Sequence, residues 1–209
     1  MAGLEDIYKR LGYLVDESGN IYSAKRDKIT GVFTIIDYAH HEIHGGSGFV
    51  CHYTQTVSDI NDKSIIAFKT GPIKYLHATV AASVTATAVA YVYEAPTITN
   101  NTGDSLSVFN RRRVGTPTET TVIDTSTTPD TAGQAMYFTE VTMGEVTGGT
   151  ELARIPLGAG AGPKVIGGLA RDTQEWILKP NTLYAFEVVS STADDNIHWI
   201  EVDFYEHSE

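Results

Sequence analysis

Short stretches in which apolar and polar residues alternate follow one another along most of this 209-residue chain. Successive side chains of a β-strand point to opposite faces, so this alternation predicts strands with one face on a core and one face outward. The clearest case is "IHWIEVDFYEH", residues 197–207. The face that we expect to lie on the core consists of His198, Ile200, Val202 and Phe204. The opposite face consists of Ile197, Trp199, Glu201, Asp203 and Tyr205.

The other stretches are rich in β-branched and aromatic residues and are separated by turn signals such as "NNTGD", "KPN" and "ADDN". A helix-length period is almost absent after residue 31, and strands without intervening helices indicate an antiparallel architecture. We therefore predict an all-β fold, with an antiparallel β-sandwich or jelly-roll-like body over residues 31–209; a closed barrel is the remaining alternative. Residues 95–133 are rich in Thr, Asp and Pro, and we expect long loops there with at most one strand at "TTVID".

The first 30 residues form a separate arm in this interpretation. "GLEDIYKRLG" predicts a short helix, because acidic residues occupy its first turn, basic residues its last turn, and a glycine follows. The apolar stripe of this helix consists of Leu4, Ile7, Tyr8 and Leu11. "YLVDESGNIYSA" predicts a small hairpin, and "KRDKITG" a charged linker.

Composition limits the classes of partner. Fifteen basic and 26 acidic residues give a formal net charge of −11, and such a chain is repelled by phosphate backbones, so we expect no nucleic-acid partner. The longest apolar-looking stretch is interrupted by threonines and a serine and is too polar and short for a membrane helix, so we expect a soluble protein without a membrane partner. The single cysteine, Cys51, predicts a chain made in a reducing cytoplasm, with the thiol buried as a small apolar group.

The segment "HHEIHGG", residues 40–46, concentrates three histidines and a glutamate. If it is extended, His40, Glu42 and His44 share one face and His41 points to the other. Two imidazoles and a carboxylate suit zinc or iron, but ligands of one metal must lie within roughly 4 Å of each other. Two histidines four residues apart on a strand are separated by about 13 Å. We therefore predict a polar strand that faces solvent or a neighbouring subunit, with no metal site and no cofactor.

One basic cluster stands out in this acidic chain: Arg111, Arg112 and Arg113. It is either a solvated loop or a bidentate grip on the carboxylates of a partner. Motifs for catalysis are missing from the sequence, since no nucleophile elbow is present and the glycine-rich "GAGAGPK" lacks the ending of a phosphate-binding loop. We therefore expect that the protein is not an enzyme.

Several ordered stretches resemble a family of virion proteins of tailed bacteriophages, the head decoration or capsid-stabilising proteins. These stretches are "IDYAHHEIHGGSGFVCHYTQ", "AVAYVYEAPT", "LSVFNRRR", "KVIGGLARDTQEWILKPNTLYAFEV" and "VDFYEH", and the resemblance as a whole covers roughly residues 32–207. The resemblance implies an all-β sandwich that assembles, often as a homotrimer, on the outer surface of a capsid, with the major capsid protein as partner and no enzymatic activity. It nominates as contact residues within the oligomer or with the shell His40, His41, Glu42, His44, Asn110, Arg111 and Arg112.

The arm lies outside this resemblance, and we expect its helix to dock on the shell or on a neighbouring chain. Two other classes remain open. A tail-fibre or baseplate module that binds a host glycan or another tail protein would share the β fold and the Thr-rich loops. A metalloenzyme built on "HHEIH" is the third class, and it would carry stoichiometric zinc or iron.

Overall fold

The computed structural model of the chain describes residues 13–15, 21–23, 43–71, 75–99, 104–114, 135–139, 145–158, 164–166 and 175–207. The helix predicted at the N-terminus lies outside these residues. Apart from one helical turn at residues 43–45, the regular structure within the described parts is strand. No helix among the described residues has both the length and the apolar character needed to span a membrane.

The strands in chain order are β1 (Tyr13–Val15), β2 (Ile21–Ser23), β3 (Gly48–Val57), β4 (Lys63–Lys69), β5 (Tyr75–Val84), β6 (Ala88–Glu94), β7 (Thr97–Thr99), β8 (Asp104–Ser105), β9 (Phe109–Asn110), β10 (Ala135–Thr139), β11 (Glu145–Thr147), β12 (Thr150–Leu157), β13 (Lys164–Ile166), β14 (Trp176–Leu178), β15 (Leu183–Ser190) and β16 (Asn196–His207). Every recorded pair of neighbouring strands among the described residues is antiparallel. The prediction of an all-β antiparallel fold is confirmed.

The chain divides into two compact units, Met1–Tyr38 and Ala39–Glu209, so the boundary falls later than the one expected after residue 30. In the first unit, β1 pairs with β2, and Val15 lies opposite Ile21. This is the hairpin that the polar run between the two short apolar segments predicts.

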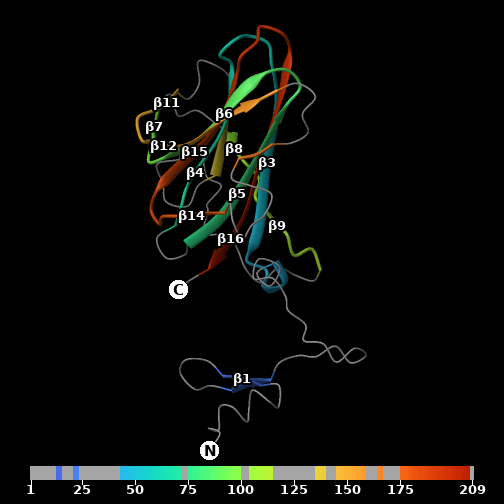
Figure 1. Ribbon diagram of the computed structural model, residues 1–209, viewed down its shortest axis with the longest axis vertical. Coiled ribbons are helices and arrows are strands. Elements are labelled where there is room, and N and C mark those ends of the chain that lie inside the picture. The colour runs from blue at the N-terminus through green and yellow to red at the C-terminus, as the bar shows by residue number, and fades with distance from the viewer. Residues whose placement is uncertain are drawn as a thin grey trace, which may run out of the picture. The chain divides into compact units, whose positions relative to one another are not determined.

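The second unit contains two large sheets, each with six strands within the described residues (Figure 1). In the first, here called the β4 sheet, the strand order is β12-β6-β15-β4-β10-β8. In the second, the β16 sheet, the order is β13-β5-β16-β3-β9, and β14 also pairs with β5. A small sheet of β7 and β11 accompanies them. Of the stretch 95–133, the described residues carry β7, β8 and β9, so it is not loop alone.

The long strands are paired in a nested order. β3 pairs with β16, β4 with β15, β5 with β13 and β14, and β6 with β12. Because β3 and β5 belong to the β16 sheet and β4 and β6 to the β4 sheet, the chain crosses from one sheet to the other between successive strands from β3 to β6. The chain therefore follows the path of one long antiparallel hairpin that is folded over on itself.

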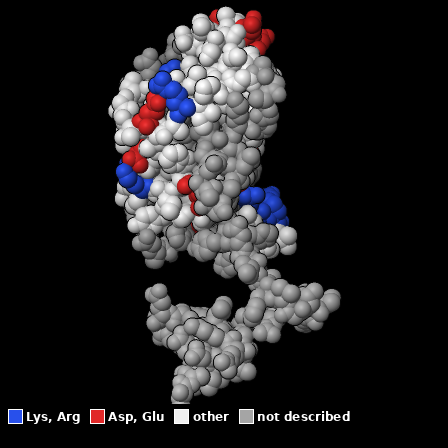
Figure 2. Space-filling view, viewed as in Figure 1, with Lys and Arg blue, Asp and Glu red and all other residues white. Residues whose placement is uncertain are grey.

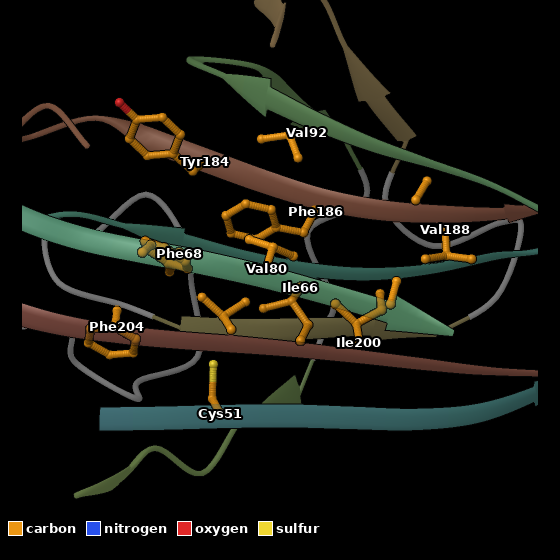
Figure 3. Close-up of a cluster of buried hydrophobic side chains, with 14 of the residues drawn as sticks. Cys51, Ile66, Phe68, Val80, Val92, Tyr184, Phe186, Val188, Ile200 and Phe204 are labelled. Carbon is orange, nitrogen blue, oxygen red and sulfur yellow. The ribbon is translucent and has the colours of Figure 1, made fainter. Parts of the chain in front are cut away.

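One apolar cluster joins the inner faces of both sheets (Figure 3). Phe68 and Phe186 of the β4 sheet lie 5.6 Å apart between ring centroids, and Phe68 lies 6.3 Å from Phe204 of the β16 sheet. All three side chains are at most 1% exposed. Burying each ring contributes roughly 1.5–3 kcal/mol from removal of apolar surface alone. Cys51 lies in this cluster at 0% exposure, as the sequence predicted.

The β4 sheet is also covered on its other face. Ile65, Ala67 and Ala185 are fully buried there and pack against Ile98 of β7 and Val146 of β11. A strand buried on both faces needs a continuous apolar run, which is why β4 contains "IIAF" rather than an alternating pattern.

Candidate functional site

Five of the residues predicted to contact partners lie within the described parts of the chain: His44, Asn110, Arg111, Arg112 and Arg113. The others lie outside it, namely Leu4, Ile7, Tyr8, Leu11, His40, His41 and Glu42. We call the five described residues, which gather at the free side of β9, the β9 ridge.

The β9 ridge joins two motifs that are far apart in the sequence. Phe49 of β3 lies opposite Asn110 of β9, and the backbone N–H of Arg111 donates to the Gly48 carbonyl at 2.8 Å. The Asn110 side chain donates from Nδ2 to the Gly46 carbonyl, 64 residues away in the chain. The end of the histidine-rich segment and the start of the arginine run therefore lie side by side at the edge of the β16 sheet.

The same asparagine also shapes the arginine run. Its Oδ1 accepts a hydrogen bond from the backbone N–H of Arg112 at 2.8 Å, two residues further on. This side-chain-to-backbone bond is how asparagine commonly sets a turn. Asn110 thus fixes both where the run is attached and the direction in which it leaves the sheet.

The polar strand predicted for "HHEIH" is wrong where the structure describes it. Residues 43–45 form a helical turn, which the Gly46 N–H closes by donating to the Ile43 carbonyl at 3.2 Å. Gly46 then takes a φ of 93°, a left-handed conformation that favours glycine. A Cβ on Gly48 would lie 2.9 Å from the Ile43 side chain, so this glycine gives Ile43 room to lie over the start of β3. His44 is exposed on the turn.

Charged groups of the β16 sheet lie beside the β9 ridge. The Arg111 guanidinium forms an ion pair with Asp203 of β16. Next to it, burial raises the pKa of Glu201, and the Asp203 charge raises it further, while His52 and Arg111 lower it. The His52 ring stacks on Phe109 with 6.2 Å between centroids. The base of the ridge is therefore held by an ion pair and an aromatic contact.

The tip of the ridge is open. Arg113 is exposed, and Val114, the next residue, is 83% exposed. Figure 2 shows basic side chains projecting from the flank on which Figure 1 places β9. Within the described residues, neither Arg112 nor Arg113 takes part in an ion pair, so both guanidinium groups can bind carboxylates of another molecule.

A second polar group lies between the two sheets and was not predicted as a unit. Ser64 of β4 donates to Gln55 Oε1 of β3 at 3.1 Å, and its Oγ lies 3.0 Å from Nδ1 of His198 on β16. Ser64 and His198 are 0% exposed. Burial lowers the pKa of His198 from 6.5 to about 4, although the nearby charge of Asp62 raises it. The imidazole is therefore neutral at physiological pH.

The direction of these hydrogen bonds opposes a catalytic role. Since the Ser64 hydroxyl donates to Gln55, His198 must donate from Nδ1 to Ser64 Oγ, whereas a general base would accept the hydroxyl proton. His198 Nε2, buried without a hydrogen-bond partner in the described structure, then carries only a lone pair. The group links the two sheets and cannot activate a nucleophile in this form.

A third polar group lies on the outer face of the β16 sheet. His77 Nδ1 lies 2.9 Å from Glu175 Oε2, and the Tyr205 hydroxyl donates to the same oxygen at 2.9 Å. The His77 and Tyr205 rings stack with 4.6 Å between centroids. These contacts explain why Tyr205 is only 5% exposed although alternation places it outward.

The sequence predicts only part of these two polar groups. Alternation placed His198 on the core face, but the sequence carries no sign that Ser64 of a different strand would meet it. Likewise, 98 residues separate His77 from Glu175, and only the pairing of β14 with β5 brings them together.

No group of three or more His, Cys, Asp or Glu side chains within the described ranges is arranged to hold a metal ion. The chain matches no protein-family model, and no curated protein matches it.

Proposed function

We propose that the chain is a structural protein of a tailed-phage particle, which assembles with copies of itself and binds the major capsid protein on the outer surface of the shell. In this proposal it stabilises the capsid, is made in the host cytoplasm, and performs no catalysis. The proposal starts from the family resemblance of the sequence, and three features of the molecule support it.

The first supporting feature is the nested strand order. Pairs β3–β16, β4–β15, β5–β14 and β6–β12, divided between two sheets, match the winding of a double-sheet jelly roll. Viral capsid domains use this architecture, but so do lectins and enzymes, so the fold supports the proposal without deciding it.

The second feature, and the single observation that carries the proposal, is the β9 ridge. The resemblance nominates His44 and the run from Asn110 to Arg112 as contact residues, and hydrogen bonds hold these segments together at one exposed edge. Residues that are nominated separately and meet on one surface are the pattern expected of a contact site.

The third feature is electrostatic. A net charge of −11 opposes placement against packaged DNA, which favours the outside of a shell. Arg112 and Arg113 offer the local positive charge with which an acidic chain can still bind carboxylates of a neighbouring subunit in the particle. If several copies act together, modest contacts multiply to an avidity gain on the order of 10²- to 10⁴-fold.

Two variants test the proposal on particles that carry the protein. Deleting residues 2–30 should release the protein from the particles and leave the β body folded, because the arm is expected to dock on the shell or on a neighbouring chain. Arg112→Ala with Arg113→Ala should weaken binding in a co-sedimentation assay. Arg154→Ala with Lys179→Ala is the control that removes the same charge on a different surface, where it also breaks ion pairs with Glu151 and Glu94. Retained binding by both test variants, or electron cryomicroscopy of particles that places the chain elsewhere, contradicts the proposal.

One observation favours a second candidate, a tail-fibre or baseplate module that binds a host glycan. On the outer face of the β16 sheet, Trp199 is half-buried and lies between Thr54 and Ser83 in the strand register. An aromatic ring flanked by hydroxyl groups suits the apolar face of a sugar. Mass spectrometry of separated heads and tails distinguishes the two candidates, since this one requires the chain in tails.

A further inference from the structure

Large hydrophobic side chains are exposed at five places in the described structure, and four of them fall in two groups. Phe109 (46% exposed) and Val114 (83%) flank the arginine run. Ile60 (56%) lies in the loop between β3 and β4, and Ile197 (43%) is the second residue of β16, next to the loop that follows β15. The fifth, Ile177, lies on β14. Exposed apolar groups with a polar rim are typical of protein contacts.

The first group belongs to a basic patch, which we define as Phe109, Arg112, Arg113 and Val114. The arginines extend from the sheet edge where Asn110 holds the chain, so their backbone is anchored before any partner binds. Anchoring of this kind lowers the entropy lost on binding.

The second group belongs to an acidic patch, which we define as Asp59, Ile60, Asp194, Asp195 and Ile197. The two loops that carry it are joined by backbone hydrogen bonds, since Asn61 donates to Ser190 at 2.9 Å and Ser190 donates to Asp62 at 2.8 Å. Asp59, Asp194 and Asp195 are exposed, and none of them forms an ion pair with another described residue.

The two patches of one molecule cannot meet each other. The basic patch follows β9, which pairs with β3 at Phe49 and Val50, whereas the acidic patch follows the other end of β3 at Val57. A strand of ten residues spans roughly 30 Å, nearly four Debye lengths at physiological salt, where one is about 8 Å. Two complementary surfaces at opposite ends of a rigid sheet can be satisfied together only by other molecules.

We propose that the basic patch of one copy of this chain docks on the acidic patch of the next copy. The contact pairs Arg112 and Arg113 with the exposed carboxylates and brings Phe109 and Val114 against the two isoleucines. The apolar groups supply most of the affinity, because exposed ion pairs contribute little on their own, and the charges orient the encounter. A contact between different surfaces is heterologous and gives a closed ring when the rotation between copies allows it. This inference deepens the proposed function by naming the surface through which copies assemble.

The test is a charge swap, read by sedimentation velocity and native mass spectrometry over a range of protein concentrations. Arg112→Glu with Arg113→Glu should raise the dissociation constant between copies about tenfold or more, and so should Asp194→Arg with Asp195→Arg. The variant that carries all four changes should return the constant to within a few fold of the wild type. High salt should weaken the wild-type assembly.

Arg154→Glu with Lys179→Glu is the charge control, because it changes the net charge equally at side chains that are 61% and 68% exposed on another surface, although it also breaks their ion pairs with Glu151 and Glu94. This control should assemble as the wild type does, and circular dichroism should show that every variant is folded. A wild type that stays monomeric, a patch variant that assembles normally, or a four-change variant that stays apart overturns the inference. Binding to particles is measured separately, so a monomeric wild type that still binds them overturns the inference and the self-assembly part of the proposed function, and leaves only the binding to the shell standing.

Discussion

Replacing His198 with glutamine is expected to reduce the loss of stability that occurs when the pH is lowered from 7 to 5. In the folded protein, burial lowers the pKa of His198 from 6.5 to about 4. As the pH falls through 6.5 the unfolded chain binds a proton at this residue, and the folded chain does not until about pH 4. The unfolded state therefore binds more protons in this window, and stability falls as the pH falls.

The size of the effect follows from the two pKa values. Each pH unit inside the window costs about 1.4 kcal/mol, so the difference between pH 7 and pH 5 is about 2 kcal/mol for this one residue. Glutamine has no titratable group and is long enough to bond Ser64, so its free energy of unfolding should lack this term. With a denaturant slope of about 2 kcal/mol per M in urea, the wild-type midpoint should shift about 1 M further than that of the variant.

The measurement is urea unfolding of both proteins at several pH values, followed by circular dichroism. Other groups titrate in both proteins and cancel in the difference, provided that they are independent of His198. Imperfect hydrogen bonding by glutamine would lower the stability equally at every pH. The comparison therefore uses only how the free energy of unfolding of each protein changes with pH. Parallel curves for the two proteins, within about 0.5 kcal/mol, would show that His198 accepts a proton in the folded state and would refute the argument.

Three further predictions rest on single side chains. Phe68→Ala should lower the free energy of unfolding by about 3–5 kcal/mol in chemical denaturation, because it opens a cavity between the sheets. Phe109 is half-exposed, so Phe109→Ala should change this free energy by about 0.5 kcal/mol or less. Similar losses in the two variants would contradict the assignment of Phe68 to the core. Gly149→Ala should lower the melting temperature clearly more than Gly148→Ala. Both glycines have a positive φ, but only at Gly149 would the new Cβ lie 2.6 Å from a backbone oxygen. Equal melting temperatures of the two variants would refute this prediction. Cys51 should resist a thiol-specific reagent in the native protein and react in urea, since it is fully buried and burial raises its pKa to about 12; rapid native labelling would show that this edge of the core opens.

The alternation of apolar and polar residues sufficed to predict the strands that have one face toward solvent. In β16 the four residues expected on the core, from His198 to Phe204, are each at most 1% exposed. Tyr205 departs from the outward pattern because His77 stacks on it, and that partner comes from a strand more than a hundred residues earlier. Alternation therefore reports the face of a side chain but not what covers it.

The histidine-rich segment shows a different limit. Its spacing predicts an extended segment. In the structure, Gly46 and Gly48 allow a helical turn in which the Ile43 side chain packs on the start of β3. The turn is also held by the Asn110 side chain, from a segment that the sequence gives no reason to place there. The residues of the β9 ridge could therefore be named from the sequence, whereas the geometry of the ridge depends on the pairing of β9 with β3.

The nested strand order could not be derived from pattern at all. A polar turn separates β15 from β16, and such turns usually close a hairpin, yet these two strands enter different sheets. Pairing β15 with β16 in one hairpin and placing them in two facing sheets both satisfy the same alternation, because each strand needs a core on only one of its faces. What decides between them is the summed packing of the whole interior, which no window of a few residues contains.

The place of β16 between β3 and β5 has a consequence for synthesis of the chain on the ribosome. β3 is translated roughly 7 to 30 seconds before its central neighbour, at about 5–20 residues per second. During that time the inner faces of β3, β4 and β5 have no complete sheet to enter, and the emerging polypeptide depends on holding chaperones or on speed to avoid aggregation. Folding of the β body is thus expected to be post-translational, and a ribosome stalled before Asn196 should display a protease-sensitive nascent chain.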